Sequence, residues 1–212
     1  MEQESNLNQA YALAADLAMD KLIGMDFESI SINTNSKLSR DRTAIYTKYL
    51  NKDYAVFPGT RCIEYLTPTD GYPPIQITEK VLILHYLTTA EVCTPLSANL
   101  ISFKEIAEGA IYYPSFHKRA IKPMIKVFSN NLEGFFKVGE RLGGVREAYG
   151  DASFTLEVFP LVPVTYVIWQ GDDEVEANGT ILFDSSISNY LSVEDIVIAA
   201  SFPVYSMMRL LR

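Results

Sequence analysis

The apolar residues of this chain change their spacing along the sequence, and this change constrains the fold more than any other feature. From Phe27 to Leu66 polar and apolar residues alternate with period two, as in Ser29-Ile30-Ser31-Ile32, which is typical of β-strands. Three further stretches of this region are rich in aromatic and β-branched residues: 44–50, 54–57 and 62–66. Turn-forming residues at 51–53 and at Pro58-Gly59 separate them, so we expect a small antiparallel meander.

Helical spacing replaces this alternation on both sides of the meander. Helices are predicted over 6–23, 77–90, 115–128, 131–142 and from Ser192 onwards. Ser115 is expected to cap the third of these helices, and Pro123 and Pro203 are expected to kink or interrupt the helices that contain them. Pro68–Pro74 predicts a loop, and 97–109 a loop with a short helical turn.

The last third of the chain returns to strand-like patterns before its final helix. Strands are predicted at 154–159, 163–169 and 180–183, with a polar turn through Asn178-Gly179. No linker or repeat divides the chain. We therefore expect one α+β domain over 1–212, in which small antiparallel sheet regions pack with about five helices. Its parts are an N-terminal helix plus β-meander to about residue 66, a helical middle at 76–143, and a β-hairpin and C-terminal helix at 150–212.

Charge is distributed unevenly over this pattern. No lysine or arginine lies between Arg146 and Arg209, and ten of the 26 acids of the chain fall in this gap. The formal net charge of -8 therefore comes from the C-terminal third. Such a one-sided negative field argues against nucleic-acid binding on that face and leaves cations or basic partners open.

Several absences favour a cytoplasmic location. No apolar run is long enough to cross a membrane, and the acidic residues 2–5 do not open a secretory signal. Cys62 and Cys93 fit neither a metal-ligand spacing nor a disulfide framework, so we expect two reduced thiols in the core.

Four acids form the candidate metal site of the sequence: Asp172, Asp173, Glu174 and Asp184. Carboxylates on a turn between strands can gather Ca²⁺ or Mg²⁺, which prefer oxygen ligands. Metal binding is favoured if Asp172 and Asp184 face each other across the hairpin, because unpaired buried carboxylates are costly. The alternative interpretation is a solvated acidic turn, with Asp184 serving as a cap before Ser185-Ser186.

Basic residues at 117–126 form the candidate ligand site. Lys118, Lys122 and Lys126 recur every four residues beside His117 and Arg119, and a positive strip of this kind can hold phosphate or carboxylate groups. Two alternatives remain open. The strip is a solvated face opposite Phe116, Ala120, Met124 and Phe128, or it docks against the acidic third of the same chain or of a second copy.

Two further side chains have both a structural and a functional interpretation. His85 lies in an apolar helix and is expected to be a core histidine bonded to backbone or water, with a catalytic or ligand-binding role as the alternative. Trp169 ends an apolar strand, and we expect it to be buried near the start of the last helix or to form the wall of a site for a flat ligand. The ligand-binding candidates are thus Trp169, His117, Lys118, Arg119 and Lys122.

A family resemblance rests on short segments that occur in a fixed order. They are Leu84-His85-Tyr86-Leu87, 101–105, Phe116-His117-Lys118-Arg119-Ala120, 142–144, 169–174, 182–186 and Tyr190-Leu191-Ser192-Val193-Glu194-Asp195. Together they resemble the prokaryotic family called domain of unknown function 3786, over roughly residues 8–200. The resemblance implies no established activity. Some members of that family carry a four-cysteine iron–sulfur module, which implies a setting in anaerobic one-carbon metabolism with corrinoid proteins. This chain has only two cysteines.

The sequence therefore favours a non-catalytic binding or accessory protein with a protein partner or a small anionic ligand. A metal-dependent enzyme that uses the acids at 172–184 is the alternative. The sequence indicates neither a cofactor nor an oligomeric state. It contains no Gly-rich phosphate loop, nucleophile elbow or Rossmann fingerprint.

Overall fold

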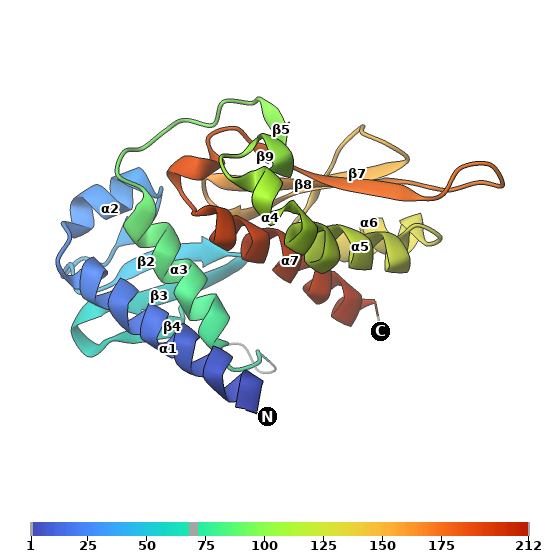
Figure 1. The fold of residues 1–212 in the computed structure, drawn as a ribbon. Coiled ribbons are helices and arrows are strands. Elements are labelled where there is room, and N and C mark those ends of the chain that lie inside the picture. The colour runs from blue at the N-terminus through green and yellow to red at the C-terminus, as the bar shows by residue number, and fades with distance from the viewer. Residues whose placement is uncertain (1, 68–71, 212) are drawn as a thin grey trace.

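Two antiparallel sheets and the helices packed against them make up the structure, a computed structural model that describes residues 2–67 and 72–211 (Figure 1). The first sheet has the order β1-β2-β3-β4, and its strands are Lys37–Leu38, Ile45–Tyr49, Lys52–Phe57 and Cys62–Tyr65. Leu50 and Asn51, with φ values of 47° and 59°, form the two-residue turn of the β2–β3 hairpin. The predicted meander is confirmed for β2, β3 and β4.

The second sheet has the order β5-β9-β8-β7-β6. Its strands are Leu100–Ser102 (β5), Val145–Arg146 (β6), Ala152–Phe159 (β7), Val162–Trp169 (β8) and Asn178–Asp184 (β9). The hairpin of β8 and β9 projects from the body of the molecule (Figure 1). Asn178 pairs with Trp169 as the first residue of β9, so the predicted turn at Asn178-Gly179 is wrong and the turn precedes it.

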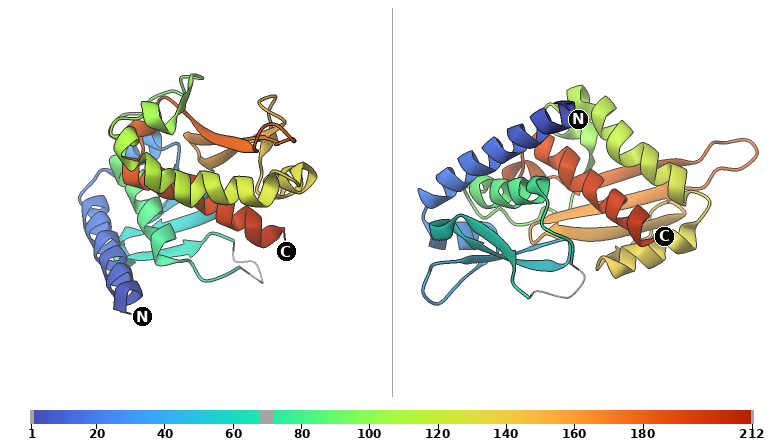
Figure 2. Two further views of the ribbon diagram at one scale, coloured as in Figure 1. Left: turned by 45° about the vertical axis from the view of Figure 1, so that its right-hand side comes forward. Right: turned by 90° about the horizontal axis from the view of Figure 1, so that it is seen from below.

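Helices cover one face of each sheet (Figure 2). The α-helical segments are Glu2–Ile23 (α1), Phe27–Asn33 (α2), Ile77–Thr89 (α3), Gly109–Phe116 (α4), Lys122–Phe128 (α5), Leu132–Arg141 (α6) and Val193–Leu210 (α7). Short 3₁₀ turns lie at Pro58–Thr60, Phe103–Glu105 and Ile187–Asn189. A π-helical turn at His117–Ile121 joins α4 to α5, so these form one continuous helix and six helices remain in the described residues.

The segment 29–32 is helical although its residues alternate. Asp26 caps α2, since its Oδ2 accepts hydrogen bonds from the backbone N–H and the hydroxyl of Ser29, at 2.9 and 2.7 Å. Of its two isoleucines, Ile30 is buried and Ile32 is 67% exposed. The predicted strand is therefore wrong, because the cap and a single buried contact stabilise a short helix.

The helix predicted to begin at Ser115 begins six residues earlier, at Gly109. Pro114 lies within α4, and Pro123 lies at the start of α5, directly after the π-helical turn. Pro203 lies within α7, which continues to Leu210. These prolines are thus accommodated inside longer helices and do not end them.

Aromatic side chains join the two sheets into one core. Phe159 of β7 packs against Tyr49 of β2, with ring centroids 5.0 Å apart, and stacks on Tyr86 of α3 at 4.2 Å. All three side chains are almost fully buried. This shared core confirms a single α+β domain.

Three smaller expectations have separate outcomes. Cys62 is half-buried and Cys93 is exposed, so the prediction of two core thiols is wrong. None of the helices in 2–67 and 72–211 is long and apolar enough to span a membrane. The loop predicted at Pro68–Pro74 lies partly outside the described residues.

Candidate functional site

Helices α1, α3, α4 and α7 meet at two adjoining hollows that share Ala14, His85 and Asp195. One hollow has a volume of about 370 Å³, and Tyr112, Arg119 and Glu194 also line it. The other, of about 410 Å³, extends along α1 to Lys21 and includes Ser192. We call the two together the His85 cleft. It brings together residues from four helices that are far apart in the sequence (Figures 1 and 2).

An imidazole–carboxylate pair lies at the centre of the His85 cleft. The Nδ1 atom of His85 is 2.9 Å from both carboxylate oxygens of Asp195. Asp195 is buried, whereas the His85 side chain is 31% exposed. An ionised carboxylate only accepts hydrogen bonds, so Nδ1 carries a proton and Nε2 is the nitrogen left for a ligand. Among the described residues, no partner is bonded to Nε2.

The start of α7 fixes the position of Asp195. Ser192 caps this helix, and its hydroxyl both accepts from the Asp195 backbone N–H, at 3.2 Å, and donates to Asp195 Oδ2, at 2.7 Å. A carboxylate is stabilised in the first turn of a helix by the free N–H groups there. The cap at Ser192 therefore also aims the Asp195 carboxylate at His85.

His85 therefore differs from its predicted role. It is not a fully buried core histidine bonded to backbone or water, because it lies at the cleft surface and pairs with a carboxylate from another helix. Its helix α3 buries Val81, Leu84 and Tyr86 on neighbouring positions, which fixes the direction in which His85 points.

Two other groups extend the His85 cleft towards α4. The Tyr112 hydroxyl donates to Oε1 of Glu194, and this hydrogen bond raises the pKa of Tyr112. Arg119, which also lines the cleft, belongs to the π-helical turn. Pro123 explains that turn, since it has no N–H to donate to the Arg119 carbonyl four residues earlier. The N–H of Lys122 bonds instead to the His117 carbonyl, which widens the helix at Arg119.

Of the five predicted ligand-binding residues, only Arg119 lines the His85 cleft. His117, Lys118 and Lys122 are exposed on α4–α5, while Phe116, Ala120, Met124 and Phe128 are buried. The basic strip is thus the solvated face of an amphipathic helix. No ion pair joins its lysines to the acids at 172–176 within the described residues, although Gln170 at the hairpin base bonds to the Ser129 carbonyl at 3.0 Å.

Trp169 corrects a further expectation. It is 40% exposed and pairs with Asn178 at the base of the projecting β8–β9 turn. The prediction of a buried residue near the start of the last helix is therefore wrong. β8 carries Trp169 beyond the part of the sheet that α7 covers, and this position does not line the His85 cleft.

The four acids predicted as a metal site are not brought together. Asp172, Asp173 and Glu174 lie in the exposed turn that precedes β9, whereas Asp184 is the last residue of β9. A strand of this length separates the two positions by about 20 Å. Nor do the described residues contain any group of three or more histidine, cysteine and acidic side chains that could hold a metal ion.

Asp172 and Asp184 instead accept hydrogen bonds that shape the turns in which they lie. Asp172 Oδ1 accepts from the N–H groups of Glu174 and Val175, at 2.9 and 2.8 Å, and these bonds lower the pKa of Asp172. Burial by itself would raise the pKa of Asp184, but hydrogen bonds from Ser186 and Ser97 outweigh it and hold the pKa below its usual value. Asp184 thus forms a turn with Ser186 and is not a helix cap, since Ser186 itself is the capping residue of the 3₁₀ turn that follows.

Sequence reasoning missed the pairing of His85 with Asp195, whose positions are 110 residues apart. A partial signal was present. His85, Arg119 and the Ser192–Asp195 turn all belong to the short segments that carry the family resemblance. Each segment by itself indicated only a helix face or a helix cap.

A family model described as Domain of unknown function (DUF3786) matches residues 26–205, so the chain belongs to this family. The comparisons with curated proteins and with solved structures gave no match. The expected family membership is confirmed.

Proposed function

We propose that this member of the family is a binding or accessory protein, non-catalytic, that takes a small anionic ligand in the His85 cleft. One observation carries the proposal: the guanidinium of Arg119 and the partnerless Nε2 of His85 line the same hollow. Arg119 forms no ion pair with a described residue, so its charge is free to meet a carboxylate or a phosphate.

The contacts of His85 support the same ligand class. Asp195 holds Nδ1, so Nε2 is left to form a hydrogen bond with a polar group of the ligand.

Isothermal titration calorimetry with inorganic phosphate and with citrate tests the proposal. Arg119→Gln should weaken binding about tenfold or more, since a charge-assisted contact is lost. Lys122→Gln is the matched control, because it removes an exposed cation of the same helix that does not line the cleft. Equal affinities in the two variants would exclude the cleft as the binding site.

An acid–base enzyme is the second candidate, and the His85–Asp195 pair is the observation that favours it. A histidine whose Nδ1 is held by a buried carboxylate presents Nε2 as a general base. Exchange of the carbon-bound hydrogens of a carboxylate ligand such as citrate for deuterium, followed by NMR in D₂O, separates the two candidates. A catalyst exchanges protons and loses this activity in His85→Gln, whereas a binding protein exchanges none.

The cytoplasmic location and the setting in anaerobic one-carbon metabolism remain predictions. A thermal-shift comparison with and without a corrinoid tests the second of them, because a ligand that binds the folded state raises the midpoint of unfolding. The metal-dependent alternative also stays a prediction; the acids at 172–174 lie in the turn before β9, and Asp184 ends that strand.

A further inference from the structure

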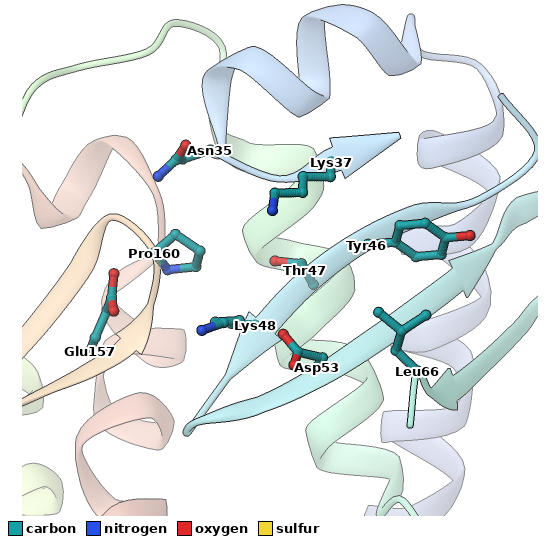
Figure 3. Close-up of a pocket in the computed structure, with 9 residues that line it drawn as sticks. All are labelled: Asn35, Lys37, Tyr46, Thr47, Lys48, Asp53, Leu66, Glu157 and Pro160. Carbon is teal, nitrogen blue, oxygen red and sulfur yellow. The ribbon is translucent and has the colours of Figure 1, made fainter. Parts of the chain in front are cut away.

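Side chains of β2 alternate between the two faces of the first sheet. Tyr46 and Lys48 lie on the face that is turned away from α3, where they border a surface hollow (Figure 3). Tyr49 lies on the opposite face, against the core, and only 1% of it is exposed. On that face it lines a different hollow, where the sheet meets the first turn of α3 and the C-terminal half of α7.

This hollow, which we call the Tyr49 hollow, has a volume of about 240 Å³. Most of its wall is apolar or aromatic and is formed by Tyr49, Tyr54, Leu142, Phe202 and Leu210. A cavity of about 150 Å³ is sufficient to bind benzene, so the Tyr49 hollow has room for a substituted ring. We propose that it binds a small aromatic acid whose ring carries a hydroxyl group.

The hydroxyl of Tyr49 is the observation that points to a ligand. It is shielded from water, and within residues 2–67 and 72–211 it has no hydrogen-bond partner. A buried hydroxyl without a partner destabilises a fold, whereas phenylalanine would place the same ring there without that group. A ligand oxygen that accepts a hydrogen bond from Tyr49 explains a tyrosine at this position.

Glu79 supplies an acceptor near this hydroxyl. Burial raises the pKa of Tyr49, and the negative charge of the Glu79 carboxylate raises it further. Glu79 also lines the Tyr49 hollow, and it is held in place by the Tyr54 hydroxyl, which donates to Oε1 at 2.5 Å, and by the Gln76 N–H, which donates to Oε2 at 3.2 Å. Each carboxylate oxygen can accept a further hydrogen bond. The two side chains therefore suit a hydroxyl group that accepts from Tyr49 and donates to Glu79.

Two cations of the Tyr49 hollow suit the acid group of the ligand. Arg209 of α7 is exposed and forms no ion pair with a described residue. Lys52 of β3 also lines the hollow, and its nitrogen lies 5.3 and 4.9 Å from the ring centroids of Tyr65 and Tyr72. A guanidinium binds a carboxylate through two parallel hydrogen bonds. The ring between the two polar ends of the ligand then packs against Phe202 and the other apolar side chains.

NMR titration of the ¹⁵N-labelled full chain with 4-hydroxybenzoate tests this site. We expect shifts at the backbone amides of Leu50, Glu79 and Ser206, which line the Tyr49 hollow, and a dissociation constant below about 1 mM. Benzoate lacks the hydroxyl group and should bind at least about fivefold more weakly, because Tyr49 is then left without a partner. The proposal is overturned if these amides do not shift at about 10 mM 4-hydroxybenzoate, or if benzoate binds equally well.

Tyr49→Phe separates a binding role from a structural one, because it removes the hydroxyl and keeps the ring. It should weaken the binding of 4-hydroxybenzoate about fivefold and leave that of benzoate unchanged. The midpoint of thermal unfolding should stay the same or rise, since a buried hydroxyl without a partner is lost. Equal affinity of Tyr49→Phe and the unaltered chain for 4-hydroxybenzoate would contradict the proposal.

An arginine pair distinguishes this site from the His85 cleft. Arg209→Gln should weaken the binding of 4-hydroxybenzoate about tenfold, whereas Arg119→Gln is the matched control and should not change it. Loss of binding in Arg119→Gln alone would place the ligand in the His85 cleft and would overturn the proposal. Because Arg119 and His85 do not line the Tyr49 hollow, its failure and that of the anion site in the His85 cleft are distinguishable.

Discussion

Replacement of Asp184 by alanine should be one of the more damaging single changes in this chain, because five hydrogen bonds end on its buried carboxylate. Oδ1 accepts from the N–H and hydroxyl of Ser97, at 3.1 and 3.0 Å, and from the N–H and hydroxyl of Ser186, at 2.9 and 2.6 Å. Oδ2 accepts from the N–H of Ala98 at 2.8 Å. The side chain thus ties the end of β9 to the segment that leads into β5.

The size of the effect follows from these bonds. Removal of one partner from a buried, charged network costs about 3–5 kcal/mol, because the donors that remain lose their acceptor. In a chain of 212 residues this lowers the midpoint of thermal unfolding by about 6–20 °C. Asp184→Asn should cost less, about 1–3 kcal/mol, since the amide keeps one oxygen and sets its NH₂ group against the Ala98 N–H.

Urea unfolding followed by circular dichroism measures both variants, and Asp172→Asn is the matched control. Asp172 is exposed, and asparagine keeps the single oxygen that accepts its two backbone bonds, so we expect a change within about 0.5 kcal/mol. If Asp184→Ala unfolds at the same urea concentration as Asp172→Asn, the bonds to Asp184 do not stabilise the fold and this reasoning is refuted.

The same carboxylate makes stability depend on pH. The pKa of Asp184 is lower in the folded chain than its ordinary value of 3.8, so its ionised form stabilises the folded state at every pH above that value. This contribution is lost as the pH falls from 3.8 through the lower folded pKa. Asp184→Asn should therefore flatten the acid limb of the stability profile below about pH 4 and leave its slope near neutral pH unchanged.

Three further predictions follow from single contacts. Trp169→Ala should cost only about 1–2 kcal/mol in urea unfolding, because the side chain is 40% exposed; a loss of about 3–5 kcal/mol would indicate a buried residue. His85→Ala should cost about 1–3 kcal/mol through the lost bond to Asp195, and unchanged stability would mean that the pair does not hold α3 to α7. Gly109→Ala should lower the free energy of unfolding by about 2 kcal/mol or more, because the added Cβ would lie 1.9 Å from the Phe103 carbonyl oxygen. Gly59→Ala is the control and should be neutral, since the space around Gly59 is open. Equal melting temperatures for the two variants would contradict the packing at Gly109.

Local periodicity was sufficient to predict most of the secondary structure. The helix at 77–89 and the strands of the meander have apolar residues spaced as their conformation requires, so each element could be identified without its neighbours. The amphipathic character of α4–α5 was predicted in the same way, because burial of Phe116, Ala120 and Met124 leaves the lysines exposed. The strand predicted at 29–32 failed because a cap at Asp26 outweighs a weak alternation.

The sequence by itself therefore determined the fold class, most elements and their buried faces, since these depend on residues within a few positions of one another. Tertiary structure alone decided that His85 meets Asp195, that β5 pairs with β9, and that Trp169 is exposed while Asp172 and Asp184 lie apart. These outcomes depend on the direction in which whole helices and strands pack. A short motif fixes the chemistry of a side chain, but the packing of distant elements determines which groups it meets.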